Sequence, residues 1–129
     1  MSEDQRIVLD FIDACSANDI EAILDFFDPD CVYHNMPVAP VKGIEAIRGV
    51  LESFLRLASK VDWQVRSVAD AGDGTVLTER LDRFLMGKTW VELPVMGAFE
   101  VRGGKITAWR DYFDFQQFQK QLPPPPDAG

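Results

Sequence analysis

The sequence has few of the residues that build disulfide scaffolds, metal centres or nucleic-acid surfaces. Its only two cysteines, Cys15 and Cys31, lie in apolar patterns, so we expect free buried thiols rather than a disulfide. The single histidine, His34, has no cysteine or histidine partner at ligand spacing, which argues against a zinc site built by the protein. Lysine and arginine number 13 against 21 acidic residues, and the net charge of -8 disfavours nucleic acid and anionic membranes as partners.

Long apolar runs are also missing. None approaches the roughly 20 residues of a membrane span. The start, MSEDQRIVLDF, has no basic segment followed by an apolar one, so we expect no signal peptide and a cytoplasmic protein. With 47% hydrophobic residues, the chain suits one globular domain over residues 1–122. The remaining stretch, PPPPDAG at 123–129, predicts an extended, mobile tail.

Helical periodicity dominates the first half of the chain. Ser2 followed by acidic residues is typical of a helix start, and apolar residues from Ile7 to Cys15 then recur at helical spacing. Asn18 or Asp19 can cap a second helix, and a third follows Gly43. The second helix is expected to carry Ile20, Ile23, Leu24 and Phe27. Between these two helices, DPDCVYHNM predicts a turn and a short strand that Pro37 and Pro40 end.

The second half alternates with period two, as strands do. Val61, Trp63 and Val65 begin the first of these strands, and Val68 falls out of phase, which predicts a bulge or an end. Further strands are expected over 76–85, 89–101 and 105–115, followed by a short closing helix. Helices followed by antiparallel strands predict an α+β domain. Its curved sheet of four or five strands would form a cone whose open mouth favours one apolar pocket.

Three polar groups stand out on these strands, because side chains two residues apart share a face. Tyr33 and Asn35 form one group, Arg80 and Asp82 the second, and Asp111 lies on the face of Trp109 and Phe113. If the three faces line one cavity, it holds two carboxyl groups, a guanidinium, a phenol and an amide. Each group also has a simpler interpretation.

The simpler interpretations follow from the same pattern. On the strand over 76–85, the opposite face carries Leu77, Leu81 and Leu85, and periodicity alone would bury these leucines and leave Arg80 and Asp82 in water. Tyr33 and Asn35 could satisfy nearby backbone groups at a strand end. Asp111 could form an ordinary salt bridge.

The motifs YHNMP (33–37), TERLD (78–82) and GKITAWRDYFD (104–114) resemble the limonene-1,2-epoxide hydrolase family in kind, order and separation. The resemblance starts at RIVLDFIDA (6–14) and runs to about Phe118. It implies a cone-shaped curved mixed sheet packed on helices, as in nuclear transport factor 2 and ketosteroid isomerase. It also implies a homodimer that needs no metal or organic cofactor. His34 replaces a residue that is usually an amide, and the turn before GKTW (87–90) is shorter than in the limonene enzyme, so both bear on substrate choice.

Carried over residue by residue, the resemblance implies an acid–base triad of Asp82, Arg80 and Asp111, supported by Tyr33 and Asn35. Asp111 would take a proton from a water held by Tyr33 and Asn35, while a protonated Asp82 would donate to the epoxide oxygen. The substrate would be a hydrophobic epoxide, cyclic or terpenoid-like, opened to a diol without a covalent intermediate. Apolar residues that could form the pocket wall or the core are Leu93, Val95, Phe84, Phe113, Phe118, Ile12 and Leu51.

Two other functions remain open at this point. A ketosteroid isomerase or polyketide cyclase also uses a carboxylate in an apolar pocket, although neither chemistry calls for an arginine between two acids. A binding or dimerisation module without catalytic activity is the second. The natural substrate, its regiochemistry and its enantiopreference do not follow from the residue pattern.

Overall fold

The computed structural model describes residues 1–122, and the predicted proline-rich tail lies outside these described residues. Its elements in chain order are α1 (Glu3–Ser16), α2 (Ile20–Leu24), β1 (Phe27–Asn35), β2 (Val41–Lys42), α3 (Ile44–Leu55), β3 (Lys60–Asp70), β4 (Thr75–Met86), β5 (Thr89–Arg102), β6 (Lys105–Tyr112) and α4 (Phe115–Gln119). None of the helices in this part of the chain is long and apolar enough to cross a membrane.

The helix starts follow local capping rules. Ser2 and Gln5 form a reciprocal capping box before α1, and the Asp19 side chain accepts a hydrogen bond from Ala22 N at the start of α2. Of the two caps considered for α2, Asp19 is therefore the one used. Phe27, expected on this helix, instead begins β1, because α2 ends at Leu24. That prediction was wrong.

The six strands form one curved mixed sheet in the order β2-β1-β6-β5-β4-β3. Strands β3 to β6 form an antiparallel meander, β1 runs parallel to β6, and β2 pairs with the outer edge of β1. The prediction of four or five strands missed β2, which is only two residues long. The register shift between Val65 and Ser67 confirms the bulge expected near Val68. The α+β class and the mixed, helix-backed sheet are confirmed.

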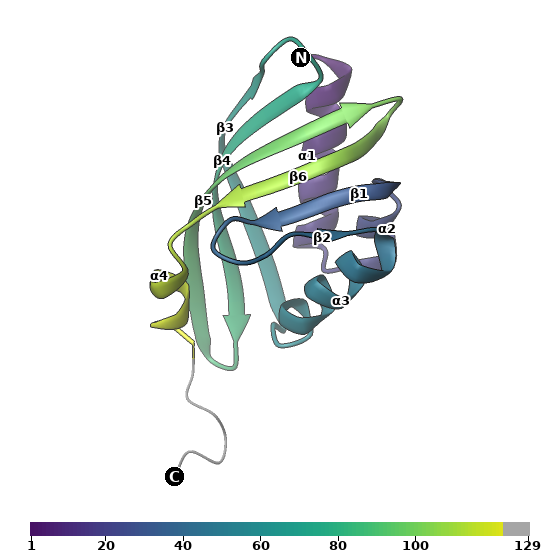
Figure 1. Cartoon of the computed structure of the whole chain (residues 1–129). Helices are drawn as coiled ribbons and strands as arrows, with labels where there is room; N and C mark the ends of the chain where they lie inside the picture. The colour runs from purple at the N-terminus through teal and green to yellow at the C-terminus, as the bar shows by residue number, and fades with distance from the viewer. Residues whose placement is uncertain (123–129) are drawn as a thin grey trace.

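Helices α1 and α3 lie against one side of the sheet, and α4 follows the end of β6 and lies beside β5 (Figure 1). The core between the sheet and α1 is largely aromatic. The Phe11 ring meets the Trp109 ring edge-on at 5.0 Å between centroids, and Phe99 stacks on Trp109 at 5.8 Å. Offset and edge-on aromatic pairs are favourable at these separations, so this cluster anchors the inner face of β6.

Strand β4 decides between the two interpretations of its alternating pattern. Its inward face carries Val76, Thr78, Arg80, Asp82 and Phe84, all buried, whereas Leu77 is 42% exposed. Burying three leucines would have gained more hydrophobic free energy than burying an arginine and an aspartate. The sheet nevertheless turns the charged pair inward, where other buried groups compensate it.

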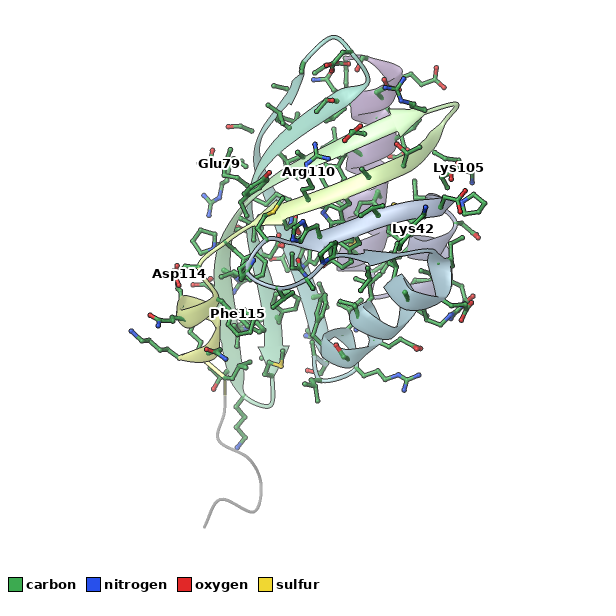
Figure 2. All side chains as sticks on the ribbon, in the orientation of Figure 1. Lys42, Glu79, Lys105, Arg110, Asp114 and Phe115 are labelled. Carbon is green, nitrogen blue, oxygen red and sulfur yellow. The ribbon has the colours of Figure 1, made fainter. Side chains whose placement is uncertain are left out.

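The last strand is shorter than predicted. It ends at Tyr112 rather than Phe115, because the Asp114 side chain accepts a hydrogen bond from Gln117 N and caps α4. Figure 2 shows Asp114 and Phe115 beside the first turn of α4, at the open end of the sheet. Phe113 lies in the short connection between β6 and α4.

Candidate active site

Arg80 is the centre of a buried network of charged groups. Its side chain projects from β4 into the domain and is 2% exposed. Nε donates to Asp82 Oδ1 at 3.0 Å and Nη2 to Asp82 Oδ2 at 2.9 Å, a two-point pairing within one strand. Nη1 donates to Asp111 Oδ1 at 3.2 Å and Nη2 also to Asp111 Oδ2 at 2.8 Å. One guanidinium therefore bridges two buried carboxyl groups through four hydrogen bonds.

The fifth guanidinium N–H is also used, because Nη1 donates to Thr78 Oγ1 at 3.2 Å. Two aromatic rings also pack near the guanidinium. The Trp63 ring lies 5.0 Å from Cζ and the Phe99 ring 5.9 Å, both within the range of a cation–π contact. Every N–H group of the guanidinium thus has a partner, and two aromatic rings help to hold it in one position.

Asp111 owes its position to the parallel pairing of the first and last strands. In that register Asn35 lies opposite Asp111 and Tyr33 opposite Trp109. The Trp109 Nε1–H donates to Asp111 Oδ1 at 2.8 Å, and the Tyr33 ring stacks on Trp109 with centroids 4.0 Å apart. Asp111 therefore accepts three N–H donors while its neighbours hold its rotamer.

Strand β5 runs between β4 and β6, and it can do so at this point only because residue 97 is glycine. Gly97 is the register partner of both Thr78 and Asp111. A Cβ atom at residue 97 would lie 2.4 Å from Arg80 Nη1, 2.8 Å from Asp111 Oδ1 and 2.9 Å from Thr78 Oγ1. The missing side chain is the space through which the guanidinium reaches Asp111.

Burial changes the protonation equilibria of this network. It raises the pKa of Asp82 from 3.8 to about 6, although Arg80 pulls the pKa the other way. Burial and then the nearby charge of Asp111 raise the pKa of the Tyr33 phenol well above its ordinary value, so Tyr33 stays neutral. Burial opposes ionisation of Arg80, but Asp111 and Asp82 outweigh it and raise the pKa of Arg80. The network combines a fixed cation, a neutral phenol and a carboxyl group that binds a proton near pH 6.

All five predicted polar residues lie at one place. Tyr33, Asn35, Asp82 and Asp111 line a cavity of about 240 Å³, and Arg80 lies behind the two acids. Five of the seven predicted apolar wall residues line it as well: Leu93, Val95, Phe84, Phe113 and Phe118. The remaining two, Ile12 and Leu51, do not line the cavity. They are 1% and 0% exposed in the hydrophobic core, because their helices turn these faces toward the sheet.

Several lining residues were not predicted. They come mainly from α3, from the loop after β1 and from α4, and they are Val38, Val50, Ser53, Phe54, Trp63 and Phe115. Trp63 was recognised only as part of a strand, although its place directly opposite Asp82 in the β3–β4 pairing follows from the register. Its Nε1–H has no hydrogen-bond partner among the described residues.

Within residues 1–122, no group of three or more histidine, cysteine, aspartate or glutamate side chains is arranged to hold a metal ion. Both cysteines are free and buried, as predicted. The two carboxyl groups that Arg80 joins line an apolar cavity, and such an arrangement suits proton transfer to and from a bound molecule.

Comparison with known proteins points the same way. Residues 2–124 match the family model of the limonene-1,2-epoxide hydrolase catalytic domain. The chain is 34% identical over 113 residues to the epoxide hydrolase EphG of Mycobacterium tuberculosis, covering 87% of this chain and 74% of that protein. A solved LEH-like epoxide hydrolase of M. tuberculosis superposes with a TM-score of 0.78 at 32% identity, over 93% of this chain and 89% of the other.

A protein of ketosteroid isomerase-like fold from Catenulispora acidiphila superposes with a TM-score of 0.79 at 23% identity, covering 91% of this chain and 93% of that one. At this identity the likeness concerns the fold alone. It confirms the predicted cone-shaped architecture.

Proposed function

Because this chain belongs to the limonene-1,2-epoxide hydrolase family, we propose that its cavity adds water to a hydrophobic epoxide and releases a vicinal diol. The protein is an epoxide hydrolase of the limonene-1,2-epoxide hydrolase type. The observation that carries the proposed mechanism is the buried Arg80, which joins Asp82 and Asp111 at the polar end of an otherwise apolar cavity.

In the proposed reaction Asp111 is the general base. It removes a proton from a water molecule, and the water oxygen attacks one epoxide carbon. The Tyr33 phenol and the Asn35 amide, which line the same cavity, hold this water by hydrogen bonds. The neutrality of Tyr33 at all physiological pH values supports this role, because only the neutral phenol can donate a hydrogen bond.

Asp82 is the general acid in the same step. As the carbon–oxygen bond breaks, the protonated Asp82 gives its proton to the epoxide oxygen, which leaves as a hydroxyl group rather than an alkoxide. The raised pKa of Asp82 supports the assignment, because it increases the protonated fraction at a given pH. Asp111 ends the step protonated and Asp82 ionised, so one proton must return from Asp111 to Asp82 before the next turnover.

Arg80 lowers the free-energy cost of keeping Asp111 ionised and Asp82 protonated. One guanidinium balances one carboxylate, so the network has no net charge while Asp111 is ionised and Asp82 is protonated. A second buried carboxylate without a counter-charge would be costly. Since Arg80 contacts both acids, the proton can move between them without a change in the position of the cation.

The apolar wall supports a hydrophobic substrate, cyclic or terpenoid-like. The lining of the cavity is mainly aliphatic and aromatic. Its other side chains are those of the two acids, Tyr33, Asn35 and Ser53. An anionic epoxide would lose its hydration there without gaining a cationic partner, because no lysine or arginine of residues 1–122 lines the cavity.

We further propose that the chain forms homodimers through the outer face of its sheet. Met96 and Tyr112 are adjacent in the β5–β6 pairing and are 52% and 48% exposed. Leu77 on the same sheet is also exposed. Apolar side chains gathered on a sheet face are typical of a protein interface. Light scattering should give twice the chain mass for the wild type, and M96K should shift it toward the monomer; an unshifted dimer would place the interface elsewhere.

A single turnover in water enriched in heavy oxygen tests the mechanism. Direct attack by water puts the label in the diol and none in the protein, whereas a covalent ester would leave label in an aspartate. Absence of diol with a panel of cyclic and linear epoxides, together with turnover of an enone, would instead indicate an isomerase.

A further inference from the structure

A row of five phenylalanine rings lines the cavity. The ring of Phe54 meets that of Phe84 at 5.8 Å, nearly perpendicular, and Phe84 meets Phe118 at 6.3 Å. Phe118 approaches Phe115 at 6.4 Å, and Phe115 approaches Phe113 at 6.5 Å. All five residues line the cavity, although they come from α3, β4, the connection after β6, and α4.

Four of these five rings are only partly buried. Phe115 is 37% exposed and only Phe84 is fully buried, so the other four present part of their surface to the cavity or its mouth. Figure 2 shows Phe115 at the end of the sheet where α4 begins. Phe84 belongs to the same hydrophobic core cluster as Phe11 and Trp109, and Phe54 and Phe118 pack against that cluster, so the row extends the core to the mouth of the cavity.

The row begins directly beside the reacting groups. Phe84 follows Asp82 by two residues on the inner face of β4, and side chains two apart on a strand lie about 7 Å from each other. Phe113 lies in the connection just after β6 and lines the same cavity as Asp111. An epoxide held between the two acids would therefore direct its carbon substituent against phenyl rings, with Leu93 and Val95 as the aliphatic part of the wall.

Resting on the proposed function for the reacting group, we propose that the natural substrate carries an aryl group next to its epoxide ring. Aromatic rings attract one another edge to face or offset, at centroid separations of about 4.5–7 Å, beyond what the buried area alone provides. A saturated ring of the same size fills the same space without this attraction. A substrate phenyl ring would join the existing row and contact two or more of its members.

Binding of two matched neutral amides tests recognition apart from turnover. Phenylacetamide and cyclohexylacetamide share the amide and the linker and differ only in the ring. We expect calorimetry to give a Kd about tenfold lower for phenylacetamide, a difference that corresponds to ~1.4 kcal/mol. Equal Kd values, or tighter binding of the cyclohexyl compound, would overturn the proposal.

Two variants, F115L at the rim of the cavity and F26L as a matched control, test whether the row of phenylalanines causes the difference in Kd. Phe115 is exposed enough for F115L to fold, and we expect it to reduce the Kd ratio about threefold or more. Phe26 is a partly buried ring that contacts Phe11 and does not line the cavity, so F26L should leave the ratio unchanged. The same reduction in both variants would refute a role for the row.

Turnover separates this proposal from the proposed function. Styrene oxide and cyclohexyloxirane differ in intrinsic reactivity, so the informative quantity is the kcat/KM for styrene oxide divided by that for cyclohexyloxirane, compared between wild type and F115L. A fall of threefold or more in this ratio supports the aryl preference. Turnover of both epoxides with an unchanged ratio would refute the preference and leave the hydrolase assignment intact. No diol from either epoxide, with a tenfold Kd ratio retained, would refute the hydrolase assignment alone.

Discussion

Replacement of Gly97 by alanine tests how the buried triad is held. A Cβ atom at this position would lie 2.4 Å from Arg80 Nη1, 2.8 Å from Asp111 Oδ1 and 2.9 Å from Thr78 Oγ1, distances that real Cβ atoms do not show. Arg80 cannot move easily, because all five of its N–H groups are hydrogen-bonded and the Trp63 and Phe99 rings pack near its guanidinium. The strand must therefore shift, or the Arg80–Asp111 contact must break.

The expected size of the effect follows from burial. Separating one partner from a buried ion pair typically lowers the free energy of unfolding by about 3–5 kcal/mol, because it leaves an uncompensated buried charge. For a domain of this size, a loss of about 3 kcal/mol lowers Tm by roughly 10 °C. A displacement of about 1 Å at catalytic groups can cost about 100-fold in rate, so kcat/KM for diol formation should fall at least that far.

Urea unfolding and a diol assay on the same preparation measure both effects. Gly49 provides the matched control: it is exposed within α3 and has no atom within 4 Å of an added Cβ. There G49A should raise the free energy of unfolding by up to about 1 kcal/mol through helix propensity and leave kcat unchanged. If G97A were as stable and as active as the wild type, the guanidinium would not occupy the space above residue 97, and the triad described above would be incorrect.

Three further predictions concern the charges. Because the acid must be protonated and its pKa is about 6, kcat/KM should fall about tenfold per pH unit above pH 6; a flat profile between pH 6 and 8 would refute Asp82 as the acid. Burial raises the pKa of Asp82 from 3.8 to about 6 in the folded state, so the contribution of Asp82 to the free energy of unfolding is complete below pH 4. About 3 kcal/mol of this contribution is lost as pH rises through 6. The free energy of unfolding of D82N, measured in urea, should not show this loss. R80K should be nearly inactive, because an ammonium group cannot pair with two carboxyl groups at two points each.

The sequence predicted the helices and the long strands well, since their periodic patterns and caps are local. It could not decide which face of β4 points inward, because three leucines and an arginine–aspartate pair compete for the same choice. What decides it is Asp111, which comes from a strand two places away in the sheet and compensates Arg80. Only the family resemblance favoured the inward orientation of the charged pair.

Other differences also have non-local causes. Ile12 and Leu51 were equally good candidates for core and cavity wall, because both environments select apolar side chains. Strand β2 has only two residues and no alternation to detect. Phe115 became a cavity residue because Asp114 starts a helix there, and a single aspartate after a strand is a weak signal.

The position of β6 in the sheet has a consequence for how the molecule is made. This strand lies between β1 and β5, yet it leaves the ribosome after all five other strands. Without this strand, β1 and β2 have no hydrogen-bonded connection to β3, β4 and β5, and Arg80 lacks its partner Asp111. The complete sheet and the proton-transfer network therefore both require the last strand to be synthesised.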